Sequence, residues 1–86
     1  MILDCRNLKL DNKKITEFEF KFLTVLANNE YNTWKNISDY VYKNQNLKNV
    51  MQAIYHIKHR LQRRLGLDID TYYEIGLRLN NKLEII

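Results

Sequence analysis

The sequence has no proline, two glycines and one cysteine among its 86 residues. A lone cysteine cannot form an intramolecular disulfide, so a disulfide-stabilised extracellular scaffold is excluded. Neither glycine belongs to a glycine-rich loop or a Walker-type phosphate-binding pattern. No apolar run approaches the roughly 18 residues of a membrane-spanning helix, and the N-terminus lacks a signal-peptide pattern. We therefore expect a cytoplasmic protein that does not enter the membrane.

Acidic residues are missing from one part of the chain. Residues 40 to 67 contain no aspartate or glutamate but hold six of the fourteen Lys and Arg residues. The rest of the chain has eight basic and ten acidic residues, so the net charge of +4 comes entirely from this segment. An uncompensated basic segment is typical of a surface that contacts phosphates. The alternative interpretation is the solvated face of a helix on a small basic domain.

Within this segment, apolar residues recur at three- and four-residue steps, the period of one buried helix face. They predict a helix over residues 47–65, with Asn46 as its cap. We expect Gly66 to end this helix, because glycine takes a positive φ without strain. The apolar stripe is Leu47, Val50, Ile54, Ile57, Leu61 and Leu65, and the opposite stripe is Lys48, Gln52, Tyr55, His56, His59 and Arg63.

Two shorter helices are predicted before the basic segment. Thr16 and Glu19 have the spacing of a capping box, which starts a helix over residues 17–28. Thr33 is the next N-cap residue and starts a helix over residues 34–43. The sequence therefore predicts three helices.

Strands are predicted at both ends of the chain. The first fifteen residues alternate in short apolar runs around Asp11–Asn12, a turn signal, and predict two or three antiparallel strands. After the long helix the hydrophobic period changes to two, which predicts a β-hairpin over residues 69–79 and a last strand in residues 82–86. Because the sequence shows no linker or repeat, we expect one α+β domain over residues 1–86.

Short strands, three helices and a terminal hairpin are the elements of a winged helix-turn-helix. Over nearly its whole length the chain resembles the DNA-binding effector domain of OmpR/PhoB-type response regulators. The matching segments are ITEFEFKFLTVLANN and TWKNISDYVY for the first two helices, NVMQAIYHIKHRL for the recognition helix and IDTYYEIGLRL for the wing. Members of that family carry a receiver domain, which this chain is too short to include, so the chain is either an excised domain or a free-standing DNA-binding protein. Because it starts with Met1 and the strand pattern begins at once, we expect the second.

The resemblance implies that the long helix enters the major groove of double-stranded DNA and that the hairpin, the wing, reaches the adjacent minor groove. The second helix and the loop before it would contact phosphates. The protein would then be a sequence-specific transcriptional regulator that binds as a monomer, a tandem pair or a homodimer. The DNA-binding residues implied are Thr33, Lys35, Lys48, Gln52, Tyr55, His56, Lys58, His59, Arg63, Tyr73 and Arg78.

Two pairs of residues depart from the family pattern. The recognition helix has Tyr55 and His56 where the family usually has arginines, and the wing has Tyr73–Glu74 in place of an Arg-Gly pair. A carboxylate at the wing tip repels phosphate. The alternative function is a protein-interaction module that binds an acidic surface of RNA polymerase or another regulator. Such a contact needs a contiguous apolar centre, which we do not expect on this helix face.

Catalytic and metal chemistry have little support in the sequence. His56 and His59 supply half of a metal site, but no nearby Asp, Glu or Cys completes it. Cys5 in a strand is expected to be a small buried side chain rather than a nucleophile. Trp34 is expected to belong to the core. We therefore expect no catalytic residue, metal or cofactor.

Overall fold

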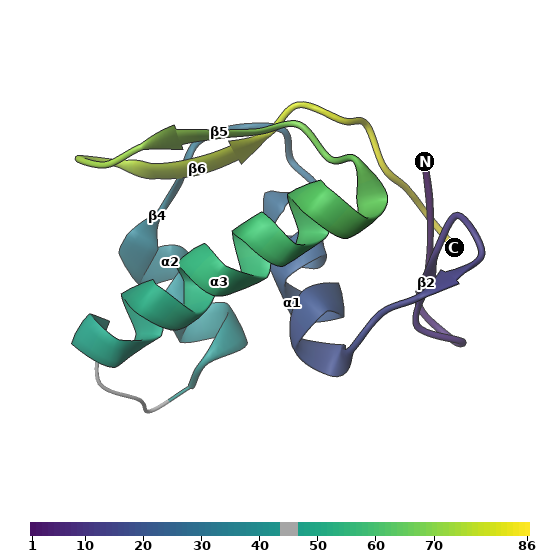
Figure 1. The fold of residues 1–86 in the computed structure, drawn as a ribbon, viewed down its shortest axis with the longest axis horizontal. Helices are drawn as coiled ribbons and strands as arrows, with labels where there is room; N and C mark the ends of the chain where they lie inside the picture. The colour runs from purple at the N-terminus through teal and green to yellow at the C-terminus, as the bar shows by residue number, and fades with distance from the viewer. Residues whose placement is uncertain (44–46) are drawn as a thin grey trace.

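The described part of the chain folds into three helices and seven short strands, an α+β arrangement as predicted (Figure 1). The computed structural model describes residues 1–43 and 47–86, without the side chains of 47–49. The expected cap Asn46 and the side chain of Lys48 therefore lie outside the described residues. In chain order the elements are β1 (Ile2–Asp4), β2 (Lys9–Leu10), β3 (Lys13–Lys14), α1 (Glu17–Leu26), β4 (Asn32–Thr33), α2 (Trp34–Val41), α3 (Leu47–Leu65), β5 (Ile69–Tyr72), β6 (Gly76–Leu79) and β7 (Glu84–Ile85).

The predicted starts of the two shorter helices are confirmed by their caps. The Thr16 hydroxyl accepts a hydrogen bond from the Glu19 amide at 3.1 Å, and the Glu19 carboxylate accepts one from the Thr16 amide at 2.8 Å. The Thr33 hydroxyl likewise accepts from the Asn36 amide at 3.1 Å at the start of α2. The two shorter helices each end two residues earlier than predicted. In α1 the reason is a turn in which Asn29 takes a φ of +59°.

The strands form two separate sheets. In the first, of order β3-β2-β1-β7, the predicted turn at Asp11–Asn12 is confirmed by φ values of +48° and +72°, and β7 runs parallel to β1. In the second, of order β4-β6-β5, the predicted hairpin β5–β6 gains the strand β4, which the sequence did not predict. Gly76 permits this pairing, since a Cβ there would lie 1.8 Å from the Asn32 carbonyl oxygen.

The predicted apolar stripe of α3 lies in the core from Val50 onward, and the side chain of its first member, Leu47, lies outside the described residues. Figure 1 shows α3 crossing in front of α1 and α2, with the β5–β6 hairpin above it. The stripe joins apolar side chains of both other helices and of the hairpin in one cluster. Trp34 packs against this cluster but is only partly buried. The fully or nearly fully buried members on α3 are Val50, Ile54, Ile57, Leu61 and Leu65.

An ion pair network centred on a buried carboxylate joins α3 to the first turn of α1. The Glu19 carboxylate has no exposed surface and accepts hydrogen bonds from Arg60 Nε at 3.1 Å and Arg64 Nη2 at 3.0 Å. Burial alone would raise the pKa of this carboxyl, but the Thr16 amide and the two guanidinium groups outweigh it and hold the pKa below its ordinary value. Glu19 therefore stays ionised and fixes two arginines of α3 in place.

The rotation of α3 can be tested by truncating a stripe residue. Ile57 is 3% exposed, so Ile57→Ala is expected to lower the free energy of unfolding by about 2 to 5 kcal/mol, measured by chemical denaturation. The matched control, Arg63→Ala on the exposed face of the same helix, is expected to change it by less than about 0.5 kcal/mol. If Ile57→Ala is as stable as the parent protein, Ile57 does not face the core.

The ion pair network predicts a pH-dependent contribution to stability. Glu19→Gln is expected to cost about 1.5 to 3 kcal/mol at pH 7, because two charge-assisted hydrogen bonds are weakened. Since the folded-state pKa of Glu19 is lowered from 4.5, this contribution is complete above that pH and is lost as the pH falls through the folded-state value. Denaturation of both proteins between about pH 7 and 3 measures the difference.

The control is Glu17→Gln in the same helical turn, where the side chain is 73% exposed and pairs with Lys21 at 3.6 Å. It is expected to cost less than about 1 kcal/mol. Equal effects of the two variants, or a Glu19→Gln effect that does not shrink in acid, would contradict the described role of Glu19.

Candidate functional site

The outer face of α3 carries the side chains expected from the helical period. Gln52, His56, His59 and Arg63 are exposed, and Tyr55 is half-buried. Because α3 is a single helix of 19 residues, these side chains form one continuous surface along it. This surface divides into two adjoining grooves of different chemistry.

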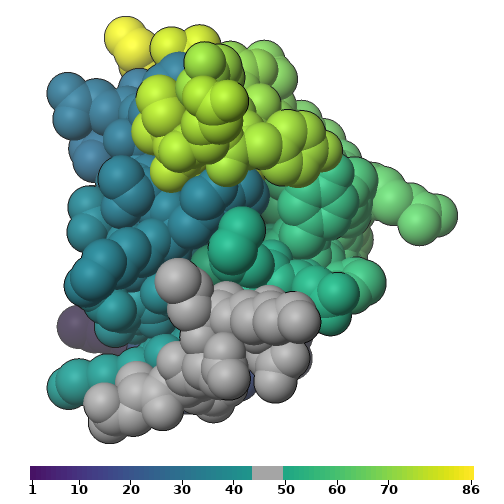
Figure 2. Space-filling model, turned by 90° about the vertical axis from the view of Figure 1, so that its left-hand side faces the viewer, coloured from purple at the N-terminus to yellow at the C-terminus, as the bar shows by residue number. Residues whose placement is uncertain are grey.

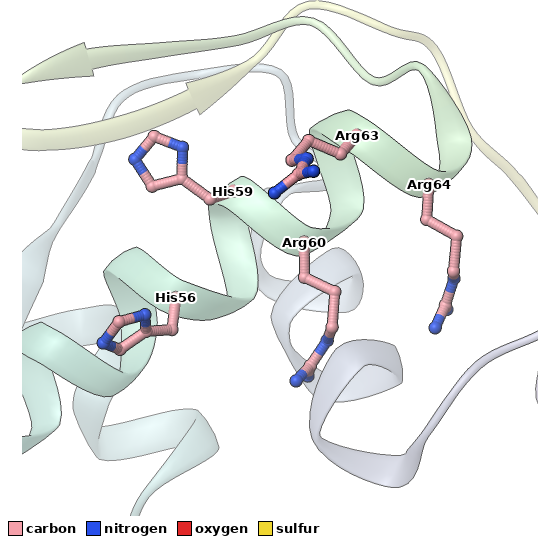
Figure 3. A pocket seen from close by; sticks show the side chains of 5 residues that line it. All are labelled: His56, His59, Arg60, Arg63 and Arg64. Carbon is pink, nitrogen blue, oxygen red and sulfur yellow. The ribbon is translucent and has the colours of Figure 1, made fainter.

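The first, which we name the basic groove, has a volume of about 580 Å³. Figure 3 shows that its side chains all come from α3, with Arg60 and Arg64 pointing toward α1. Although both arginines pair with Glu19, their side chains remain 51% and 42% exposed. The groove therefore presents three guanidinium groups and two imidazoles, and no described acidic residue lines it. Its residues are His56, His59, Arg60, Arg63 and Arg64.

The second, which we name the aromatic groove, has a volume of about 370 Å³. It lies between the start of α2, the first half of α3 and the tip of the β5–β6 hairpin. Figure 2 looks onto this end of the molecule, where the hairpin tip, in yellow-green, overhangs α2 on the left and α3 on the right. The lining residues are Trp34, Met51, Gln52, Tyr55, His56 and Tyr73.

Hydrogen bonds fix the hairpin tip against both helices. The Trp34 indole N–H donates to the Tyr73 carbonyl oxygen at 2.9 Å, and the Tyr55 and Tyr73 hydroxyls lie 2.9 Å apart. The Tyr55 and Tyr73 rings are stacked, with centroids 6.3 Å apart. The hydrogen bond to Tyr73 raises the pKa of Tyr55, so its phenol stays neutral. The hairpin tip is thereby held beside α3.

The structure corrects the expectation for Lys58. This side chain is only 7% exposed, and its Nζ lies 4.9 Å from the centre of the Tyr55 ring. Lys58 follows Ile54 by four residues and precedes Leu65 by seven, which places it beside the buried stripe. Its position is therefore set by packing and a cation–π contact, and it is not one of the exposed cations of the α3 face.

Arg78 is engaged within the hairpin. Its Nη2 donates to the Asp70 carboxylate at 2.8 Å, and its guanidinium lies 4.7 Å from the centre of the Tyr31 ring. The hydrogen bond from Arg78 lowers the pKa of Asp70, so the pair stays charged at neutral pH. Arg78 also alternates with the buried Leu77 and Leu79, which puts it on the outer side of the strand.

Of the other expected site residues, Tyr73 lines the aromatic groove, and Thr33 and Lys35 flank the lining residue Trp34 in the sequence. Thr33 is exposed and caps α2, and Lys35 is exposed and pairs with Asp39 at 2.9 Å within α2. Tyr73 is 69% exposed at the hairpin tip, next to the exposed Glu74. The structure thus brings the start of α2, the middle of α3 and the hairpin tip onto one side of the protein.

Cys5 and the histidines give no second site. Cys5 is exposed rather than buried, because β1 ends at Asp4 and Cys5 begins a turn. Within residues 1–43 and 47–86, no three His, Cys, Asp or Glu side chains cluster in a way that would hold a metal ion. Of the helices that the structure describes, none is both long and apolar enough to cross a membrane.

Sequence reasoning missed several residues of both grooves. Arg60 and Arg64 follow His56 at four-residue steps, a spacing that places the three side chains in one row of the helix. This four-residue spacing would have predicted that Arg60 and Arg64 lie next to His56 in the basic groove. Trp34 and Met51 join the aromatic groove only through the packing of the hairpin on α2 and α3, which has no local signal.

Taken together, the two grooves place cationic, amide and aromatic groups side by side, and His56 lines both. No protein-family model, curated protein sequence or solved structure matches this chain.

Proposed function

We propose that the protein is a transcriptional regulator that binds double-stranded DNA sequence-specifically, with the fold of a winged helix-turn-helix. In this proposal α3 is the recognition helix in the major groove, and the β5–β6 hairpin is the wing. The observation that carries the proposal is the continuous face of α3, on which a cationic groove adjoins one that bears an amide and aromatic rings. The proposal assigns no catalytic residue, metal or cofactor.

The basic groove supports contacts with the phosphate backbone. Guanidinium groups donate paired hydrogen bonds to phosphate oxygens, and such contacts dominate the affinity of DNA-binding proteins. The Glu19 carboxylate pairs with Arg60 and Arg64, but it is fully buried beneath them and leaves their outer sides exposed. Arg63 is exposed as well. At the start of α2, the N-cap residue Thr33 and Lys35 are exposed, and they could make a second set of phosphate contacts.

The other half of the α3 face supports base recognition. Gln52 is exposed in the aromatic groove, and a glutamine amide pairs with the N6 and N7 atoms of adenine. His56 adjoins Gln52 on the side of the basic groove, where an imidazole reaches either a base edge or a phosphate. A basic groove for phosphates and an amide for bases match the general pattern, in which phosphate contacts position a protein and base contacts specify the sequence.

A protein-interaction module is the second candidate, and one observation favours it. Trp34, Met51, Tyr55 and Tyr73 gather in one groove and supply an apolar centre that was not expected on this face. Such a centre, with a basic rim, suits an acidic protein partner such as an RNA polymerase subunit or another regulator. The exposed carboxylate of Glu74 at the hairpin tip would be harmless in that contact.

Binding to DNA through these cations predicts a strong dependence on salt. If about four to six basic side chains meet phosphates, the logarithm of the binding constant is expected to fall with the logarithm of the salt concentration with a slope of about −4 to −5. Fluorescence anisotropy with a random-sequence duplex between about 50 and 200 mM salt measures this slope. Binding that does not respond to salt, or no binding, would count against the proposal.

Base recognition predicts that two exposed residues of α3 behave differently. On a preferred site selected from random duplexes, Gln52→Ala is expected to weaken binding by about 1 to 3 kcal/mol, with almost no effect on random DNA. Arg63→Ala, the matched control, is expected to weaken binding to both duplexes equally and to reduce the salt slope by about 1.

Both residues are exposed, so neither change is expected to disturb the fold. If Gln52→Ala leaves both affinities unchanged, α3 does not read the bases. The protein-interaction candidate then becomes the better account.

A further inference from the structure

We propose that the aromatic groove recognises an A·T base pair, by holding the thymine 5-methyl group against an apolar wall beside the Gln52 amide. This inference rests on the DNA binding proposed above and names the base pair and the residues that read it. It adds Met51 and the aromatic rings to the recognition surface.

The groove presents mainly ring surfaces, because the indole N–H and one of the two tyrosine O–H groups are bonded within the protein. The Trp34 indole N–H is bonded to the Tyr73 carbonyl, and the Tyr55 and Tyr73 hydroxyls are bonded to each other. Met51, which is 37% exposed, adds a flexible and uncharged thioether to the same wall. The wall is therefore mainly apolar, and the hydrogen bonds of the hairpin tip hold it in place.

An amide stands directly beside this wall. Met51 and Tyr55 lie four residues apart on α3, as do Gln52 and His56, so the two pairs form adjacent rows of one helix face. In the major groove an A·T pair presents the N6 donor and N7 acceptor of adenine together with the O4 and 5-methyl group of thymine. A glutamine next to an apolar surface matches that combination. A G·C pair has no methyl group and would place the cytosine amino group against apolar atoms.

The charge of the neighbouring surface favours DNA over an apolar peptide as the occupant. His56 lines both grooves, and beyond it the basic groove presents three guanidinium groups. A base pair is always flanked by phosphates, so one duplex would fill the aromatic groove and neutralise the basic groove at once. An apolar peptide would leave the exposed sides of these guanidinium groups without a binding partner.

Replacing thymine by uracil tests the inference, because it removes the methyl group and keeps every hydrogen-bonding group and charge. Each thymine of the preferred duplex is replaced in turn, and affinity is measured by anisotropy. We expect one replacement to weaken binding by about fourfold, the value for one buried methyl-sized group, with the salt slope unchanged. Met51→Ala is expected to bind the thymine and uracil duplexes with more nearly equal affinity than the parent.

The matched control is Ile75→Ala, which removes an apolar side chain that is 43% exposed in the hairpin turn but does not line the groove. It is expected to keep the preference for thymine. Salt-dependent binding that is equal for all thymine and uracil duplexes would overturn this inference and leave DNA binding intact. Absence of salt-dependent binding to any duplex would overturn the proposed function and this inference with it.

Discussion

The carboxylate of Glu19 lies fully buried beneath α3 and accepts hydrogen bonds from Arg60 and Arg64, and the arrangement of the candidate site depends on this contact. A buried carboxylate is costly unless its oxygen atoms are paired. The same carboxylate also accepts a hydrogen bond from the Thr16 amide at the start of α1. One side chain therefore caps α1 and holds two arginines of α3 in place. Since Arg60 and Arg64 are held from below, their exposed sides face outward into the basic groove.

A second set of contacts holds the hairpin against the helices. Trp34 at the start of α2 binds the backbone of Tyr73, whose hydroxyl binds Tyr55 in the middle of α3. These bonds connect residues 39 and 18 positions apart in the sequence. These bonds hold the hairpin tip against the helices, so that Tyr73 forms one wall of the aromatic groove. The ion pairs at Glu19 and the hydrogen bonds at Tyr73 thus place the two grooves next to each other along α3.

Local patterns in the sequence predicted the elements well, whereas contacts between distant segments were beyond them. The apolar stripe through Ile54 and Ile57 predicted α3 correctly, because the three- and four-residue spacing of a buried helix face can be read from a short stretch of sequence. The strand β4 was missed because two residues have no period, and its partner β6 lies more than forty residues away. Lys58 was predicted to be an exposed DNA contact because of its charge, although its spacing from Ile54 places it beside the buried stripe. The aromatic groove was not foreseen, since only the folded hairpin brings Trp34 to α3.

The central claim is that the outer face of α3 meets duplex DNA, and an NMR titration of the labelled protein with its preferred duplex tests it residue by residue. We expect the backbone amide signals of Gln52, His56 and Arg63 and that of Tyr73 at the hairpin tip to shift or broaden in proportion to bound DNA, whereas amides of the four-stranded sheet around Leu3 stay in place. Changes centred on that sheet, with the α3 face undisturbed, would contradict the account.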